Sequence, residues 1–425
     1  ADQVRARLAG SGNAEADWPM HRRDIRRSGS TRMNVGSNLT AKWSMTLQSP
    51  GTQPVVVGKR LWIAEKDRHR VRCLDTDTGN ELWSHTAAGR IDSAPTINRG
   101  RVFFGCRDGA VYCLNAEDGR LVWRFLAAPE DRRIVAHEQL ESVWPIHGSV
   151  VVQDGVVYYC AGRSSYLDGG MLVQGLDAVT GELRYSHHLE GPWPDIRTDT
   201  GTPFAMEGAL PDLFVGDGED LYMGRIKFNA KLNRLEVKKG SPLGELDMGK
   251  VHLTATGGFL DSSGFDRIFW MHSRYWPGFY FSNHAPKSGQ LLVFNDTTTS
   301  ATKYFYERHM WSPLFVPGEK GYPLFADRNG NEPVFWTKDS PSESREWIPG
   351  AKPGGRQGGI GTEKGTGYVR IAPPEWLMMI PVRTRAMVLA GDKLLLAGTP
   401  DVVDDKDPSA ALEGRKGALL HVYRA

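Results

Sequence analysis

Hydrophobic and polar positions of this chain alternate in short runs that recur at a fixed spacing. The phrase VRCLDTDTGNELW at residues 71–83 returns forty positions later as VYCLNAEDGRLVW at residues 111–123. In each copy, two alternating runs flank a break that contains glycine, which is typical of two strands joined by a tight turn. Self-similarity with a period of 20–50 residues indicates a repeat architecture. We therefore interpret the phrase as a structural unit and not as an active-site motif.

The longer unit around the second copy predicts four strands. In SAPTINRGRVFFGCRDGAVYCLNAEDGRLVWRF, residues 93–125, the breaks NRG, RDG and EDG separate four runs. These runs predict strands at 95–97, 102–105, 110–115 and 121–125. Four antiparallel strands in about forty residues make one propeller blade. The pattern therefore predicts an all-β fold, a β-propeller of four-stranded antiparallel blades.

Further copies of the unit set the blade count. One copy begins at PVVVGKRLW before the quoted phrase, and another begins at GSVVVQDGVVYYC after it. The turn glycine of the later copy, Gly181, follows Gly119 by 62 residues, so this repeat carries an insertion. Weaker copies continue to the end of the chain. The count favours seven blades and allows eight.

The turn inside the phrase has a mechanical interpretation. Asp75 and its counterpart Asn115 can accept hydrogen bonds from backbone N–H groups, and the glycine that follows supplies a position with positive φ. Trp83 and Trp123 are then expected to pack between blades. The letters DTDTG resemble the start of a calcium-binding EF-hand loop, but the required Gly and Glu spacing is missing. We predict a structural turn.

The two ends of the chain predict how the ring closes. The last blade lacks a fourth strand, whereas LTAKWSMTL at residues 39–47 resembles a fourth strand with no blade before it. An open sheet edge invites aggregation, so we expect residues 39–47 to pair with residues 417–424. Residues 1–35 would then be a lead-in outside the ring, and residues 36–425 a single propeller domain.

The repeated phrase resembles the pyrroloquinoline-quinone-type propeller repeat, Leu-Asp/Asn-x-x-(Thr/Asp)-Gly-x-Leu-x-Trp, over residues 44–190. That superfamily holds quinoprotein dehydrogenases, the outer-membrane assembly propeller lipoprotein and many uncharacterised secreted bacterial propellers. The lead-in DWPMHRRDIRRSGST is similar to that of the uncharacterised group. The resemblance implies a propeller fold and a periplasmic or extracellular location in a bacterium. It does not imply one activity, because one fold carries many functions.

Composition narrows the class of protein. The chain has 425 residues and a formal net charge of +2, so nothing in its charge favours nucleic acid. Its apolar runs fall short of the ~20 residues that a membrane helix needs. The start at Ala1-Asp2 without Met fits a processed, exported chain, and we expect a monomer. The four cysteines lie in strand-like runs without metal-ligand spacing, so we interpret them as buried apolar residues: Cys73, Cys106, Cys113 and Cys160.

Insertions predict which face carries function. Connections between the first and second strands of each blade are short, whereas the insertions fall between the second and third strands and between blades. They lie at residues 126–148, 161–170, 186–208, 272–289 and 399–417. Connections of these two kinds emerge at the same end of a blade, and loops on a rigid scaffold carry function. We therefore expect them to converge over one mouth of the channel.

The candidate ligand-binding residues are cationic and aromatic side chains of these insertions. Guanidinium groups bind carboxylates, and aromatic rings cover the apolar faces of sugars. The candidates are His137, His147, Arg163, Tyr166, Arg197, Arg274, Tyr275, Trp276, Tyr280 and His284. No metal ligands are predicted, and the acidic run at Asp401, Asp404, Asp405 and Asp407 is interpreted as a solvated loop, which leaves calcium unsupported.

Three functions compete, and the sequence leaves open whether the protein is an enzyme. We favour an exported ligand-binding or scaffold propeller whose partner is an acidic carbohydrate or another envelope protein. The second is a lyase on anionic polysaccharide, since Arg, His and Tyr can supply the cation, base and acid. The third is a quinone-dependent dehydrogenase. It is disfavoured because those family members carry adjacent cysteines and longer chains, so we expect no bound quinone cofactor.

Overall fold

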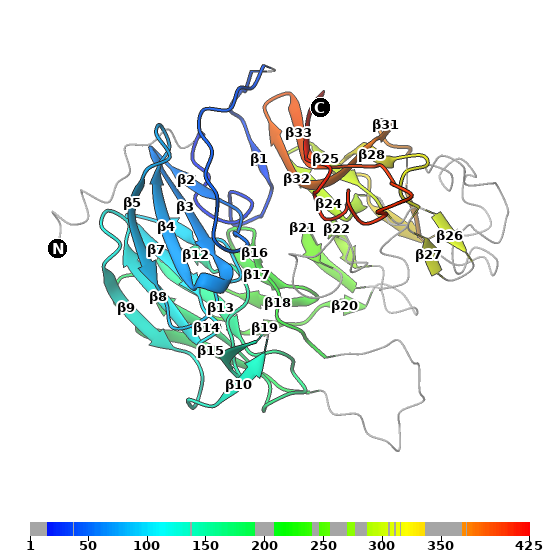
Figure 1. Cartoon of the computed structure of the whole chain (residues 1–425). Helices are drawn as coiled ribbons and strands as arrows, with labels where there is room; N and C mark the ends of the chain where they lie inside the picture. Colours follow the sequence, from blue (N-terminus) through cyan, green and yellow to red (C-terminus); the bar gives the residue numbers. More distant parts are fainter. Residues whose placement is uncertain are drawn as a thin grey trace. The chain divides into compact units, whose positions relative to one another are not determined.

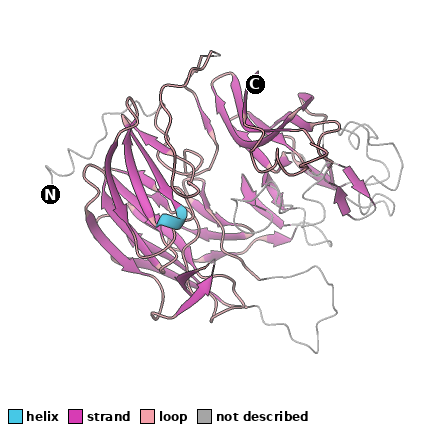
Figure 2. Ribbon diagram, viewed as in Figure 1, coloured by secondary structure: helices cyan, strands magenta, loops and turns pink. Residues whose placement is uncertain are grey.

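A computed structural model describes residues 15–36, 38–136, 138–191, 208–239, 246–255, 270–276, 287–304, 307–309, 312–314, 316–335, 368–370 and 372–425. Strands make up nearly all the regular structure of these residues, as Figures 1 and 2 show. The helical element among them is one 3-10 turn, Lys66–Arg68. The predicted all-β class is confirmed.

The chain divides into two compact units. The first comprises residues 1–27 and 38–235, and it contains four four-stranded sheets whose strands follow one another in chain order. These sheets are β2 to β5 (Val55–Val57, Arg60–Glu65, Arg70–Asp75, Glu81–Thr86), β6 to β9 (Thr96–Asn98, Arg101–Gly105, Ala110–Asn115, Leu121–Leu126), β12 to β15 (Val151–Gln153, Val156–Ala161, Met171–Asp177, Leu183–Leu189) and β16 to β19 (Phe214–Gly216, Asp220–Met223, Ile226–Asn229, Arg234–Leu235).

The second unit comprises residues 28–37 and 236–425 and contains three four-stranded sheets. Their strand orders are β20-β21-β22-β23 (Lys238–Lys239, Leu246–Ala255, Trp270–Trp276, Ser288–Gly289), β24-β25-β28-β31 (Leu291–Phe294, Thr298–Thr302, Tyr322–Arg328, Trp376–Ile380) and β1-β32-β33-β34 (Ser30–Thr31, Val382–Ala390, Lys393–Pro400, Leu419–Arg424). The seven sheets together confirm a propeller of seven four-stranded blades.

The predicted turn chemistry is present in the clear repeats. Oδ1 of Asp75 accepts hydrogen bonds from the backbone N–H groups of Asp77 and Thr78, at 2.9 and 2.8 Å. Gly79 adopts a φ of +74°, a conformation in which a side chain would be strained. The same arrangement recurs at Asn115 and Asp177.

Tryptophans connect neighbouring repeats of the first unit. The indole N–H of Trp83 donates to the carbonyl oxygen of Ala116 at 3.2 Å, and its ring lies against Gly119 in the turn of the next sheet. Trp123 does the same with Ala178 and Gly181, at 3.4 Å. The predicted packing of these tryptophans between blades is therefore confirmed.

Apolar side chains fill the spaces between neighbouring sheets. One core cluster joins the β2–β5 and β6–β9 sheets and includes Trp62, Phe104 and Tyr112. The four cysteines are buried and unbridged, and they lie within these clusters: Cys73, Cys106, Cys113 and Cys160. Burial raises the pKa of the Cys73 thiol to about 12. The cysteines therefore pack as small apolar residues, as predicted.

An N-terminal strand pairs with the C-terminal sheet, but it is not the predicted segment. β1 pairs in parallel with β32, with Ser30 opposite Leu389. Residues 39–47, all of them described, form no strand, and β34 pairs only with β33 among the described strands. Trp43 is the residue that made residues 39–47 resemble a fourth strand. Its indole N–H donates to the carbonyl oxygen of Thr76 at 3.0 Å, and its ring lies against Gly79. The tryptophan of this segment therefore packs as in a fourth strand, but the backbone forms no β-ladder with a neighbouring strand.

The described lead-in, residues 15–36, packs against the first strands of several sheets. In the first unit, Trp18 exchanges backbone hydrogen bonds with Val56, and Ile25 accepts one from Gly216. In the second unit, Ser28 accepts one from Phe294. Arg27 is fully buried and donates to three backbone carbonyls, those of His21, Ser149 and Phe214.

Candidate functional site

Three of the predicted insertions meet in the first unit. The insertion at residues 126–148 forms a hairpin of β10 (Arg133–Ala136) and β11 (Gln139–Ser142). An ion pair of 3.1 Å joins Arg132 of this insertion to Asp168 of the 161–170 connection. Ser165 then accepts the N–H of Gly191 at 2.8 Å, which joins the 161–170 connection to the described start of the third insertion. Convergence is therefore observed for these three connections.

A chain of ion pairs runs beneath the converging connections. Arg90 contacts Asp67 at 3.3 Å and Asp92 at 2.9 Å. Arg107 bonds to Asp92 and also reaches Glu141, at 2.7 Å. The chain ends where Arg163 bonds to the other carboxylate oxygen of Glu141.

The side chains of this network balance in charge and are mostly buried. Three guanidinium groups face three carboxylates, and the side chains of Asp92 and Glu141 are only 5% and 4% exposed. Buried charges are stable when each is paired and hydrogen-bonded. Arg163 is therefore held by Glu141 and does not point freely into solvent.

The network shifts the titration of its members. Burial would raise the pKa of Asp92, but the hydrogen bond with His147 and the charge of Arg107 lower it well below the usual range. Burial lowers the pKa of His147, and the charge of Arg107 lowers it further. The carboxylates of Asp92 and Glu141 raise it, but the net shift is downward. Nδ1 of His147 lies 3.3 Å from a carboxylate oxygen of Asp92.

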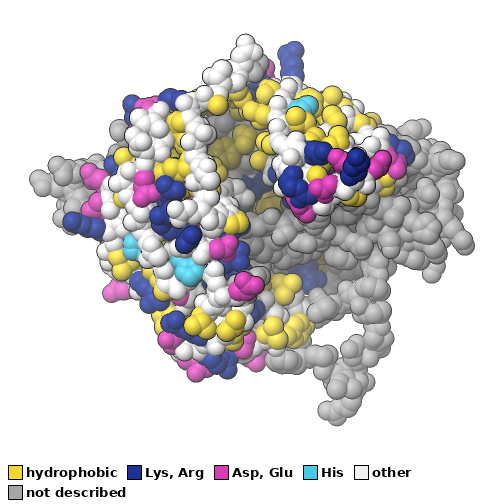
Figure 3. Space-filling model, viewed as in Figure 1, with side chains coloured by type: hydrophobic (Ala, Val, Ile, Leu, Met, Phe, Trp, Pro, Cys, Tyr) yellow, Lys and Arg dark blue, Asp and Glu magenta, His cyan; other side chains and the backbone are white. Residues whose placement is uncertain are grey.

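Above the network, the hairpin exposes apolar side chains. Val135 and Leu140 are a directly opposed pair on β10 and β11, and they are 74% and 61% exposed. Leu167 and Leu210, on the neighbouring connections, are also more than half exposed. Figure 3 shows apolar side chains at the lower edge of the first unit, where Figure 1 places β10. We call Val135, Leu140, Leu167 and Leu210 the apolar loop surface.

The structure places several predicted residues elsewhere. Arg274, Tyr275 and Trp276 lie in β22, the third strand of a sheet in the second unit, and not in an inserted loop. The alternating letters WMHSRYW are a strand pattern that we assigned to a loop. Arg274 forms two hydrogen bonds of 2.7 Å with Asp247, so this guanidinium is paired as well. Residues 277–286 lie outside the described residues, and in chain order they join the third strand of this sheet to the fourth, whereas the sequence analysis placed the insertion 272–289 between the second and third strands or between blades.

The remaining candidates divide into two groups. Tyr166 is half-buried and covers Gly208, where an added Cβ would lie 2.0 Å from its ring. Four candidates lie outside the described residues: His137, Arg197, Tyr280 and His284. The acidic run is engaged in its own loop, since Asp404 pairs with Lys416 and Asp407 with Arg415. Asp401 accepts a hydrogen bond from Tyr322 at 2.6 Å.

The sequence reading missed the acidic members of the network and one isolated carboxylate. Asp67, Asp92 and Glu141 all lie in connections between second and third strands or between sheets, the two kinds that carry the predicted insertions, and this position could have identified them. Asp212 precedes β16, is 8% exposed, and accepts the N–H of Leu213 at 2.7 Å. Burial raises its pKa to about 7, against the effect of that hydrogen bond.

No group of three or more His, Cys, Asp or Glu side chains among the described residues is arranged to hold a metal ion. No helix in the described part of the chain is long and apolar enough to span a membrane.

Comparison with known proteins confirms the resemblance to this propeller group. Residues 37–192 match the family model described as outer membrane protein assembly factor BamB. BamB of Yersinia pestis is 25% identical over 169 residues, which are 37% of each chain. The dehydrogenase subunit of a quinone alcohol dehydrogenase from Gluconacetobacter polyoxogenes is 29% identical over 167 residues, 36% of this chain and 22% of that protein. The matched segments thus span well under half of these relatives.

A quinohemoprotein alcohol dehydrogenase and BamB are among the solved structures that align with this chain. The quinohemoprotein alcohol dehydrogenase of Comamonas testosteroni aligns with a TM-score of 0.46 and 14% identity, over 93% of this chain and 71% of that one. BamB of Moraxella catarrhalis aligns with a TM-score of 0.34 and 13% identity, over 68% and 70% of the two chains.

Proposed function

We propose that the protein is a scaffold that binds another polypeptide through the apolar loop surface of its first unit. The observation that carries this proposal is the opposed pair Val135 and Leu140, exposed by 74% and 61% on a hairpin. Exposed apolar side chains that gather on a rigid support are typical of protein–protein interfaces. The ion pairs below, from Arg132 to Asp168 and from Arg163 to Glu141, hold this hairpin against its neighbours.

The pairing of the arginines argues against the acidic-carbohydrate alternatives. A ligand carboxylate would have to displace Glu141 from Arg163 or Asp247 from Arg274. Displacement would leave a protein carboxylate without its cation, and for nearly buried Glu141 this is costly. A binding protein for acidic sugars, or a lyase acting on them, is therefore the weaker reading of this surface.

The relatives support the same proposal at a coarser level. One group of matched proteins is named for outer membrane protein assembly, which is work on other polypeptides. We propose by analogy that this protein acts in the bacterial periplasm or at the envelope, as a monomer with one propeller domain that includes strand β1 of the lead-in. The sequence matches to two quinone enzymes cover only 22% and 36% of those enzymes, and we propose no quinone here.

The test compares two variants on opposite ends of one unit. The purified full chain, immobilised, is exposed to a bacterial envelope extract, and retained proteins are identified by mass spectrometry. We expect a retained envelope protein that the double variant Val135→Asp, Leu140→Asp loses. The matched control is Val179→Asp, because Val179 is 69% exposed in the turn between β14 and β15, away from the insertions.

A panel of acidic oligosaccharides, including oligogalacturonate, is screened in parallel. Tight binding of one of these sugars by the wild type, lost in Arg163→Ala, would favour the carbohydrate alternative. Equal retention of polypeptides by the wild type and the double variant would contradict the proposed scaffold role.

A further inference from the structure

The hairpin of β10 and β11 packs on the first unit with one face and presents the other to solvent. Because side chains alternate along a strand, Ile134 and the opposed Glu141 share one face, and Val135 and Leu140 share the other. Ile134 packs against the core cluster of the β6–β9 and β12–β15 sheets, and Glu141 is bound by Arg107 at 2.7 Å. Val135 and Leu140 are therefore the outward pair, and the side chains around them determine which partner fits.

The connections that meet at this surface contain more carboxylates than cations. Their described residues, 126–136, 138–148, 161–170 and 186–191, include six carboxylates and three arginines. Each arginine is paired with a carboxylate of the same connections. The pairs are Arg132 with Asp168 at 3.1 Å, Arg133 with Asp131 at 2.8 Å, and Arg163 with Glu141. Three of the six carboxylates therefore remain after this pairing.

The remaining carboxylates are Glu130, Glu138 and Glu190, which are exposed and form no ion pair among the described residues. Glu138 lies in the turn of the hairpin, and Glu130 precedes β10 in the same insertion. Glu190 follows β15, and its Cα would lie 3.2 Å from a Cβ added at Gly170, the end of the connection that carries Leu167. Acidic side chains therefore border the apolar loop surface on both the hairpin and the neighbouring connection.

Two exposed arginines of other connections also lie at this border. Arg225, between β17 and β18, donates to the carbonyl oxygen of Gly208 at 3.4 Å. Arg68 precedes His69, whose Nε2 lies 2.6 Å from Oε1 of Gln139 in the hairpin. These two cations do not outnumber the three carboxylates, so the border keeps an acidic excess. Figure 3 shows acidic and basic side chains beside the apolar ones at the lower edge of the first unit.

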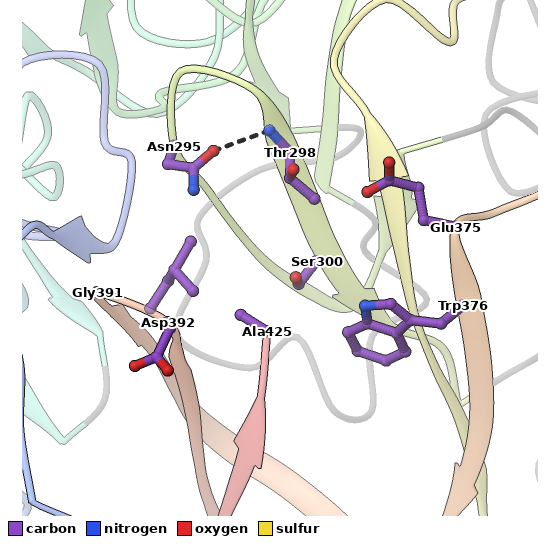
Figure 4. Close-up of a pocket in the computed structure, with 9 residues that line it drawn as sticks. Asn295, Thr298, Ser300, Glu375, Trp376, Gly391, Asp392 and Ala425 are labelled. Carbon is purple, nitrogen blue, oxygen red and sulfur yellow. Dashed lines mark hydrogen bonds between the residues drawn. The ribbon is translucent and has the colours of Figure 1, made fainter.

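A cavity in the second unit, shown in Figure 4, offers a different environment. Its volume is about 230 Å³, which is small for a polypeptide segment. Oδ1 of Asn295 accepts the N–H of Thr298 there at 2.8 Å, so part of its polar lining is satisfied internally. The lining is mainly polar and comprises Asn295, Thr298, Ser300, Glu375, Trp376, Leu389, Gly391, Asp392 and Ala425. An apolar segment therefore fits the apolar loop surface better than this cavity.

We propose that the partner of the apolar loop surface is a polypeptide segment in which an apolar stretch is flanked by Lys or Arg. This inference rests on the proposed scaffold function and names the chemistry of its partner. Apolar side chains of the segment cover Val135 and Leu140, and its cations lie beside Glu130, Glu138 and Glu190. Complementary charges at the border of an interface speed association and select among partners, whereas the buried apolar contact supplies most of the affinity.

The test compares two fluorescent synthetic peptides that share an alternating core of leucine, serine and valine. One peptide carries lysines at both ends, and the other carries glutamates. Fluorescence anisotropy with the purified full chain measures the affinity of each. We expect the lysine peptide to bind about tenfold more tightly or better at low salt, with a preference that falls as NaCl is added, because salt screens exposed charges.

Charge variants locate the preference on the surface. The triple variant Glu130→Lys, Glu138→Lys, Glu190→Lys is expected to bind the glutamate peptide more tightly than the lysine peptide. The matched control is the triple variant Glu117→Lys, Glu182→Lys, Glu219→Lys, which has the same net charge. Its exposed glutamates lie in the short turns between first and second or third and fourth strands, so it should keep the preference of the wild type.

The double variant Val135→Ser, Leu140→Ser removes the apolar pair without adding charge and separates this inference from the scaffold proposal. We expect it to bind the lysine peptide about tenfold less tightly or worse. Equal binding of both peptides by the wild type, lost in the double variant, would overturn the charge assignment and leave the scaffold role standing. Unchanged binding of the lysine peptide by the double variant would contradict the scaffold role of the apolar pair. Binding of neither peptide by the wild type, or equal loss of preference in both triple variants, would overturn the inference.

Discussion

Trp83 and Gly119 lie in neighbouring sheets of the first unit, and the indole occupies the space that any side chain at residue 119 would need. An added Cβ at Gly119 would lie 2.5 Å from Cε3 of Trp83, and the φ of this glycine is +72°. The turn between the third and fourth strands of one repeat and the tryptophan of the preceding repeat therefore pack together as one structural unit. This packing explains why the two residues recur together in the sequence.

Substitution at Gly119 separates steric from conformational cost. Gly119→Ala is expected to lower the free energy of unfolding by roughly 2 kcal/mol or more. Both the indole contact and the positive φ disfavour a methyl group at this position. Gly155→Ala is the control, since Gly155 has a φ of +77° with nothing within 4 Å of an added Cβ. It should cost only about 1 kcal/mol. Equal losses in urea denaturation would show that the indole contact does not matter.

The ion-pair network predicts a large effect at Glu141. Glu141→Gln removes the carboxylate that Arg107 and Arg163 share, and it leaves two guanidinium groups short of a counter-charge. We expect a loss of about 3–5 kcal/mol, the usual result of breaking a buried pair. Asp131→Asn breaks the exposed pair with Arg133 and should leave stability almost unchanged. Denaturant titration of both variants measures the difference.

Arg27 predicts that the lead-in stabilises the fold. Its buried guanidinium satisfies the carbonyl oxygens of His21, Ser149 and Phe214. Arg27→Ala removes these three hydrogen bonds and should cost about 3–5 kcal/mol, since hydrogen bonds to a charged group contribute roughly 1.5–3 kcal/mol each and are not additive. Arg26→Ala is the control, because Arg26 is exposed. Thermal unfolding that is unchanged in Arg27→Ala would contradict a structural role for the segment.

Asp212 predicts a pH-dependent difference in stability. Because burial raises its pKa to about 7, the folded protein keeps a proton at intermediate pH that the unfolded chain has lost. The stability associated with this proton is present at acidic pH and is lost as the pH rises towards about 7. Asp212→Asn is therefore expected to match the wild type near pH 4. At about pH 8 the variant should be more stable by up to about 4 kcal/mol, from roughly three pKa units at 1.36 kcal/mol each. A stability difference that does not change between these pH values would refute the assignment.

The sequence predicted what depends on local and repeated signals. The four strands of the second repeat match β6 to β9 within one or two residues, because alternation and turn glycines act within a few positions. The Trp43 signal was also real, since its packing on Gly79 is present. What it could not predict was that residues 39–47 would keep that packing without a strand ladder, because a ladder depends on a partner far away in the chain.

The candidate site was harder to predict because charge pairing is a property of three dimensions. Arg163 and Arg274 look like free cations in the sequence, and only the fold brings Glu141 and Asp247 to them. Strand β22 was misassigned because aromatic and cationic letters such as those of Arg274 and Trp276 occur in loops and strands alike. Exposed Val135 and Leu140 were overlooked for the opposite reason, since apolar residues in a short alternating run suggest a core.

The scaffold proposal is tested most directly by photo-cross-linking from the hairpin. A photoreactive phenylalanine analogue is placed at Val135 in one variant and at Val179 in the other, and each is irradiated in a bacterial envelope extract. The account predicts one dominant polypeptide cross-linked from position 135, absent from position 179, and lost when Leu140→Asp is added to the first variant. Cross-linking from position 135 that equals the background at position 179, or that persists with Leu140→Asp, would contradict it.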